Sequence, residues 1–392
     1  MKKEDFSGIF AYLLILAIAL VFGLTVLQKY GQETSLNTGE YIGLVIGGIL
    51  TGIIFNAILY ELGHVLGAKI GRYIILSVSV LGLTFIKNND KTHIKFQDFD
   101  GLTGETKIAP KQEEKPSNPT PFLWFPTLFI IIELLIVVVL FIVLNQTAIN
   151  TKNDLFSNIA YFLLILGVIG GMIWVYNILP LRLDTMTDGY RMTLVSNPKN
   201  KEAFNELLRV EHEIEEGNTN VDIKVFTEIT NFTAELNLNK VYVLLEKKEY
   251  LEAEKLLDII LTGENELSEK VFTRAKAQKI YINIITRSLE DAKNYYEANV
   301  PVSDRRLISN DISMPSIRTY LLMSGLLDRS RSECIIALNN LNKALSRVNK
   351  NRTNVEIPLF TDALDLVIQA HPDWELEDYR LKPVVVKESK KK

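Results

Sequence analysis

The chain has 392 residues, of which 47% are apolar and 23% charged, and its formal net charge is −4. This charge gives no basic footprint for nucleic-acid binding, and the single cysteine, Cys334, excludes a disulfide framework and a cysteine-based zinc cluster. With only four histidines, any metal site must be sparse or rely on carboxylates. The charges are unevenly distributed, because residues 121–180 carry only three, whereas the chain from Lys199 onward is rich in Lys and Glu.

Four apolar runs in the first half are long enough to cross a bilayer, which takes about 20 helical residues. The runs are Ile9–Leu27, Tyr41–Leu66, Phe122–Leu144 and Ile159–Leu179. The first follows two lysines, as a signal peptide does, but its apolar core is too long and no small-residue cleavage site follows it. We therefore expect an uncleaved membrane anchor.

The distribution of Lys and Arg predicts the orientation of these runs. Residues 68–121 carry eight basic side chains, whereas residues 28–40 and 145–158 carry one each. By the positive-inside rule, the N-terminus, the middle loop and everything after Pro180 are cytoplasmic. The sequence thus predicts a multi-pass protein of the cell membrane.

Small residues and a short strand pattern add detail to this half. Glycines recur along the second and fourth runs, where they let helix backbones approach closely in lipid. In the middle loop, Tyr73–Ile86 is rich in β-branched residues, a polar turn follows at residues 87–91, and Thr92–Phe96 alternates, which predicts a β-hairpin. The proline-rich stretch Ala109–Pro121 is predicted to be a linker.

The second half has helical periodicity. Tyr250, Ala253 and Leu257 have the spacing of the second helix of a tetratricopeptide repeat, and looser copies surround Ala292 and Cys334. The resemblance to tetratricopeptide-like repeats covers about residues 231–348, and a plain helical bundle is the alternative. Under either interpretation Cys334 is a packing residue.

Together these patterns predict an all-α multi-pass membrane protein with four transmembrane helices, a small cytoplasmic β-hairpin and a soluble α-helical repeat domain. The expected divisions are an anchor helix (1–38), a membrane core (39–195) containing the hairpin loop (69–121), a cytoplasmic tetratricopeptide-like domain (196–375) and a basic tail (376–392).

A polar constellation lies at the end of the second apolar run, which is predicted to face the cytoplasm. It reads Tyr60-Glu61-Leu62-Gly63-His64. In the pattern H-E-x-x-H, two histidines share a helix face and bind zinc, and the adjacent glutamate is the base for the attacking water. Here the glutamate and the second histidine are present, and Tyr60 stands at the first position.

A second polar motif follows the fourth run. Asn177-Ile178-Leu179-Pro180 is followed by Asp184 and by Asp188-Gly189. The predicted topology brings both motifs to the same membrane face at comparable depth, although they lie more than a hundred residues apart. This coincidence predicts a shared site.

With these motifs the chain resembles the site-2 protease family of intramembrane zinc metalloproteases, over about residues 39–192. That family carries H-E-x-x-H on the first of three core spans, a β-hairpin after it, and N-x-x-P…D-G on the third. The resemblance implies one zinc ion, Glu61 as general base, His64 and Asp188 as zinc ligands, and Asn177 as a substrate-binding or backbone-bonding group.

Two departures from the family pattern concern the metal. Tyr60 occupies a zinc-ligand position, and a phenol, with an ordinary pKa of about 10, is a poor ligand near neutrality. The gap from Pro180 to Asp188 is longer than the commonest family spacing, so Asp184 is a rival ligand. Because a catalytic zinc takes three protein ligands and a water, the sequence predicts weak or absent zinc unless another group, such as His93, completes the site.

A buried carboxyl group is predicted elsewhere, because Glu133 lies near the centre of the third run. A carboxylate at that depth is costly and is a candidate functional residue. It is expected to pair with Asn56 or Tyr60, or to stay protonated as a packing residue, with a metal or proton role as the alternative.

Two functions remain open. One is a zinc metalloendopeptidase that cuts a membrane-spanning or membrane-adjacent peptide, with zinc activating a water that Glu61 deprotonates. The other is a pseudoprotease that binds transmembrane helices and uses its cytoplasmic repeats as an adaptor for a protein partner. Both place the protein at the membrane, and neither involves nucleic acid.

Overall fold

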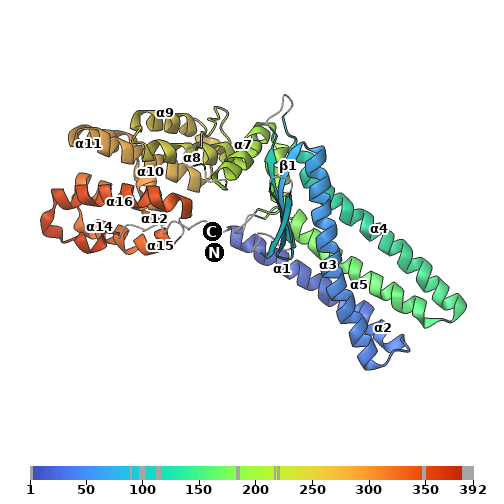
Figure 1. The fold of residues 1–392 in the computed structure, drawn as a ribbon. Helices are drawn as coiled ribbons and strands as arrows, with labels where there is room; N and C mark the ends of the chain where they lie inside the picture. The colour runs from blue at the N-terminus through green and yellow to red at the C-terminus, as the bar shows by residue number, and fades with distance from the viewer. Residues whose placement is uncertain are drawn as a thin grey trace. The chain divides into compact units, whose positions relative to one another are not determined.

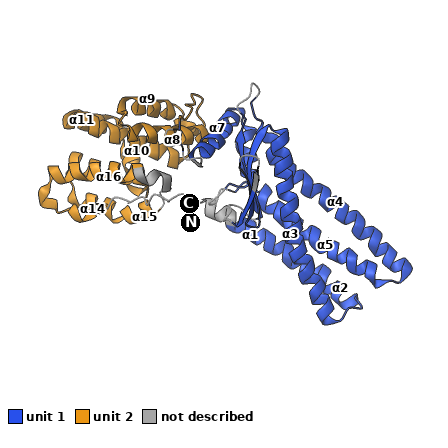
Figure 2. Cartoon of the chain, in the orientation of Figure 1, with its two compact units in different colours: residues 1–221 blue, residues 222–392 orange. Residues whose placement is uncertain are grey.

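The computed structural model describes residues 3–88, 91–96, 103–111, 116–181, 186–215, 218, 221–346 and 350–381. The chain divides into two compact units, residues 1–221 and 222–392 (Figure 2). Unit 1 carries the apolar helices and a small β-sheet, and unit 2 is helical. Of the predicted basic tail (376–392), residues 376–381 are described, and residues 382–392 lie outside the described residues.

Within the part of unit 1 that the structure describes, four helices are long and apolar enough to cross a membrane, as the sequence predicted. The first, Ile9–Glu33, comprises most of α1 (Lys3–Val21), a π-helical stretch (Phe22–Leu27) and α2 (Gln28–Glu33). The others are α3 (Thr38–Ile70), α4 (Pro119–Thr151) and α5 (Asp154–Ile178). Helices α3, α4 and α5 all pack against one another, so they form the core of this unit (Figure 1).

A four-stranded antiparallel sheet connects α3 to α4. Its strands are β1 (Tyr73–Val80), β2 (Leu83–Asn88), β3 (Lys91–Phe96) and β4 (Gly104–Pro110), in the order β3-β2-β1-β4. The predicted hairpin is therefore part of a larger sheet.

Two details of the middle loop differ from the prediction. The strand predicted over Tyr73–Ile86 is two strands, because Leu81 (φ 50°) and Gly82 (φ 88°) both adopt left-handed backbone. Positive φ at both central residues is the requirement of the tight type I′ hairpin turn. Strand β4 also includes the first two residues of the predicted linker, Ala109 and Pro110.

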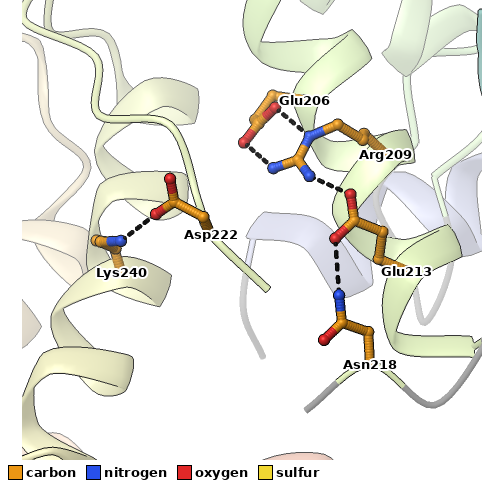
Figure 3. A network of polar contacts seen from close by, with 6 residues as sticks. All are labelled: Glu206, Arg209, Glu213, Asn218, Asp222 and Lys240. Atoms are coloured by element: carbon orange, nitrogen blue, oxygen red, sulfur yellow. Dashed lines mark hydrogen bonds and ion pairs between the residues drawn. The ribbon is translucent and has the colours of Figure 1, made fainter. Parts of the chain in front are cut away.

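Two polar helices complete unit 1, namely α6 (Asp188–Ser196) and α7 (Pro198–Glu215). Asn205 of α7 accepts a hydrogen bond from the Tyr73 hydroxyl (2.5 Å) and donates one to the Ser117 carbonyl (2.8 Å). On α7, Arg209 binds the Glu206 carboxylate through Nε (2.9 Å) and Nη2 (2.8 Å) and also pairs with Glu213 (Figure 3). The compact units divide at 221/222, so α7 lies in unit 1, although the sequence assigned it to the domain beginning at residue 196.

Unit 2 is a succession of helices joined by short connections. They are α8 (Asn231–Glu246), α9 (Tyr250–Leu261), α10 (Glu269–Thr286), α11 (Leu289–Asn299), α12 (Val302–Asn310), α13 (Met314–Leu322, with a π-helical continuation Met323–Leu327), α14 (Arg331–Asn339), α15 (Leu341–Leu345) and α16 (Lys350–Ala370), besides 3-10 turns at Glu264–Glu266, Pro372–Trp374 and Glu377–Tyr379.

One apolar cluster runs through this unit and contains the small residues on which the repeat prediction rests. Ala253, Ala292 and Cys334 are all buried in it. Burial raises the pKa of the Cys334 thiol to about 12, which disfavours the reactive thiolate. Cys334 is thus a packing residue, as predicted.

A buried ion pair lies within unit 2. Arg318 is fully buried and donates from Nη1 to the Glu356 carboxylate at 2.6 Å, while its guanidinium lies over the Tyr281 ring at 4.4 Å. At the N-terminal end of the same unit, Lys240 pairs with Asp222 at 2.5 Å (Figure 3).

Candidate functional site

Helix α3 supplies three side chains of the site. It begins with a capping box between Asn37 and Glu40 and runs without interruption to Ile70. Tyr60 and His64 are four residues apart and share a face, with Glu61 beside them. Tyr60, Glu61 and His64 are 2%, 2% and 6% exposed, so all three face the interior although they lie on an apolar helix.

Asp188 enters from the start of α6, far away in sequence. The Thr187 side chain caps this helix, donates to the Leu179 carbonyl (2.5 Å) and accepts from the Leu181 amide (3.0 Å), which fixes the chain just before Asp188. A Cβ on Gly189 would lie 1.9 Å from the Ile178 carbonyl oxygen, so only glycine permits this contact between α6 and the end of α5. Asp184, the rival ligand, lies outside the described residues.

The two sequence motifs meet at a single carboxylate oxygen. Tyr60 Oη donates to Asp188 Oδ2 at 2.5 Å, and His64 Nε2 lies 3.1 Å from the same oxygen. Asp188 itself is 5% exposed. Residues 60–64 and Asp188 therefore lie together, as predicted. They contact one another directly through the Tyr60–Asp188 hydrogen bond and the His64–Asp188 pair.

The ring of His64 is oriented by its other nitrogen. Nδ1 lies 3.1 Å from the carbonyl oxygen of Phe122, at the start of α4. Because a carbonyl only accepts, Nδ1 carries the proton of this bond, which directs Nε2 at Asp188. A ligating histidine commonly has one ring nitrogen bonded to a backbone carbonyl. The other nitrogen, Nε2, faces the Asp188 carboxylate, which also only accepts, so Nε2 carries a proton while Asp188 is ionised and would have to lose it before binding a metal.

The charge of Asp188 is stabilised by its neighbours. Burial alone would raise the pKa of this carboxyl, but adjacent His64, together with Arg191 and the Tyr60 hydroxyl, lowers it below its ordinary value. Arg191 lies one turn further along α6 and was not singled out from the sequence.

Glu61, the predicted base, is covered by strand β4. Thr106 Oγ1 donates to Glu61 Oε2 at 2.6 Å. A Cβ on Gly104 would lie 2.0 Å from the Ser79 carbonyl oxygen and 3.2 Å from Glu61 Cγ, so the strand passes directly over the glutamate. Sequence reasoning missed Thr106, although the alternation of Thr106 and Ile108 with the charged residues Glu105 and Lys107 is a period-two signal.

Other predicted residues lie elsewhere. Asn177 donates to the Ile173 carbonyl of its own helix at 3.0 Å, so its role toward substrate stays a prediction. His93 is exposed on β3, which β2 and β1 separate from β4 and Glu61. It therefore does not complete the ligand set in this arrangement. Glu133 is buried on α4.

The donor set fits a catalytic zinc site only in part. His64 and Asp188 are residue types that bind zinc, and the His64 ring is suitably oriented. The third position holds the Tyr60 phenol, whose proton is already donated to the oxygen that would bind the metal. No cluster of three or more His, Cys, Asp and Glu side chains suited to a metal occurs within the described ranges. These residues therefore do not make up the three protein ligands that a catalytic zinc requires.

Comparison of the chain with protein-family models, curated proteins and solved structures finds no match. The resemblance to the site-2 protease family consequently rests on the motif residues alone.

Proposed function

We propose that this chain is a multi-pass membrane protein of site-2 protease type that binds membrane-spanning or membrane-adjacent peptides without hydrolysing them. In this proposal the membrane core holds the peptide, and unit 2, as a cytoplasmic tetratricopeptide-like domain, binds a protein partner. The observation that carries the loss of hydrolysis is the 2.5 Å hydrogen bond from Tyr60 to Asp188.

The chemistry of this bond explains why hydrolysis is lost. A zinc ion would compete with the phenol for Asp188 Oδ2, and it would have to remove the phenol proton before Tyr60 could serve as a third ligand. The ordinary phenol pKa of about 10 opposes this removal of the proton near neutrality. Structural zinc binding is worth about 10–16 kcal/mol, and losing a ligand removes several of these. The hydrogen bond from Tyr60 to Asp188 and the contact of His64 with Asp188 therefore support a site whose side chains stabilise one another without a metal ion.

A weakly active zinc metalloendopeptidase is the second candidate. This candidate is favoured because Glu61 lies next to His64, which pairs with Asp188. Glu61 would be the base, and His64 and Asp188 would be two of the ligands, that the family pattern requires. The two candidates differ in whether the native chain binds zinc.

Metal analysis of the purified full chain distinguishes them. We expect less than about 0.1 zinc per native chain and a value approaching one for Tyr60→His, because histidine restores a third ligand of the usual type. A Tyr60→His/His64→Ala double variant is the matched control and should lose the gained zinc. Stoichiometric zinc in the native chain would overturn the proposal in favour of the enzyme.

Peptidase assays on the same samples test the scaffold. Tyr60→His should cleave a labelled transmembrane peptide, and adding Glu61→Gln should abolish cleavage while zinc is retained, since it removes the base and leaves the ligands. If well-folded Tyr60→His gains neither zinc nor activity, the site-2 protease scaffold itself is contradicted.

A further inference from the structure

A second polar cluster lies inside the three-helix core of unit 1, apart from the site above. Asn56 of α3 is fully buried, and Glu133 of α4 is 7% exposed. Both face Gly170 of α5, since a Cβ added there would lie 2.5 Å from Asn56 Oδ1 and 3.1 Å from Glu133 Oε2. Oxygens from two helices thus converge on one point of a third.

The hydrogen bonds fix the orientation of the Asn56 amide. Its Nδ2 donates to the Gly52 carbonyl (2.9 Å) and to the Leu166 carbonyl on α5 (3.0 Å), so both amide protons are used. The Asn56 Oδ1 atom is left facing the cluster. Within the described residues, neither this oxygen nor either carboxyl oxygen of Glu133 has a hydrogen-bond partner.

Three buried acceptors without a donor are costly if Glu133 is a carboxylate. A buried charge in an apolar helix core requires a counter-charge, and an acceptor deprived of a partner costs about 1–3 kcal/mol. A single proton removes the charge and leaves one of the three oxygens without a partner, because a neutral carboxylic acid has one O–H to donate.

We propose that Glu133 carries a proton and donates it in a hydrogen bond to Asn56 Oδ1. The bridge joins α4 to α3 and, through Asn56 Nδ2, to α5. Asn56 is one helical turn from Tyr60, so the bridge holds the part of α3 that presents Tyr60 to Asp188. This proposal does not depend on whether the protein binds zinc or cleaves peptides.

Infrared spectroscopy of the full chain in detergent tests the proton directly. The native-minus-Glu133→Gln difference spectrum at neutral pH should contain the C=O stretching band of a protonated carboxylic acid. This band reports the proton on Glu133, and the hydrogen bond to Asn56 is tested separately. Its absence, with carboxylate bands in its place, would overturn the proposal.

Thermal unfolding of two variants tests the hydrogen bond. Glu133→Gln keeps a neutral donor for Asn56 Oδ1, so its Tm should lie close to the native value. Glu133→Leu leaves Asn56 Oδ1 unpartnered and should lower Tm by about 4 °C or more. Equal losses in both variants would overturn the proposal. So would a sodium-dependent rise in native Tm, at constant ionic strength, that Glu133→Gln abolishes, because this outcome indicates a cation site.

Discussion

The role of Tyr60 follows from its hydrogen-bond acceptor, Asp188. The Tyr60 hydroxyl is buried on an apolar helix, where an unpartnered hydroxyl is costly, and Asp188 is its acceptor. The same carboxylate lies against His64. A residue that is poor for metal binding is thus well suited to hold α3 and α6 together.

We expect Tyr60→Phe to destabilise unit 1 by about 1–3 kcal/mol, because Asp188 Oδ2 loses a buried donor while the ring packing is kept. Thermal unfolding of the full chain in detergent measures this change. Tyr250→Phe, which removes the hydroxyl of a partly buried tyrosine in unit 2, is the control and should change Tm little. An unchanged Tm in Tyr60→Phe would mean that the hydroxyl contributes nothing to folding.

For single residues, the sequence predicts the members of a short motif. It misses residues that contact the motif only because the chain folds back onto it. Glu61, His64 and Asp188 follow from motif and topology. Thr106 does not, because its contact with Glu61 depends on a strand whose pairing partner lies about thirty residues away. The orienting contact of His64 with the Phe122 carbonyl is likewise invisible, since any residue at position 122 offers a backbone oxygen.

At the scale of elements, glycine spacing along α3 determines how closely its neighbours approach. A Cβ on Gly63 would lie 2.6 Å from Pro126 Cα, and one on Gly67 would lie 2.3 Å from the Pro121 carbonyl oxygen. Both contacts are with the backbone of α4, which cannot rotate away. The expectation that glycines serve packing is confirmed at these positions, whereas a Cβ on Gly43 would meet no atom within 4 Å.

This contrast provides a matched pair of variants on one helix. Gly67→Ala should destabilise the chain by about 1–3 kcal/mol or more, since α4 must shift to admit the methyl group. Gly43→Ala should be neutral or slightly stabilising, because alanine has the higher helix propensity. Thermal unfolding and size-exclusion profiles of the two variants provide the comparison. Equal effects would show that the close approach of α3 and α4 is not needed for stability.

The long apolar helices and the hairpin strands are predicted from the sequence, whereas strand β4 is not. The apolar helices follow from hydropathy, because each is a stretch of 25 or 33 mainly apolar residues, long enough to cross a bilayer. Strand β4 is seven residues long and contains Gly104 and Pro110, two residues that disfavour strands. It forms because β1 offers a free edge, which is a non-local cause.

For the whole molecule, the change in composition and the boundary between compact units are different features. Apolar residues give way to polar ones near residue 196, yet α7 belongs with unit 1 because Asn205 binds both Tyr73 and the Ser117 carbonyl. The composition of a segment reflects the environment that its side chains face, whereas the unit boundary depends on which residues are in contact. The polar helix α7 can therefore belong to the unit that contains the apolar helices.

The membrane topology predicts where each end of the apolar helices lies. Reporter fusions after residues 35, 100 and 200 should read outside, inside and inside, because residues 68–121 carry eight Lys and Arg against one in each opposite loop. Fusions are made to the full N-terminal portion in each case, and a cytoplasmic and a translocated marker protein serve as controls.

The fusion after residue 100 is the most informative of the three. It reports the side of the sheet that covers Glu61, and hence the side from which a peptide would reach Tyr60, His64 and Asp188. If the reporters read outside at residues 100 and 200 and inside at residue 35, the orientation in the membrane would be the opposite of the one predicted. The β-sheet, the Asp188 end of the core and unit 2 would then face away from the cytoplasm, and a cytoplasmic adaptor role for unit 2 would be contradicted even if the fold were unchanged.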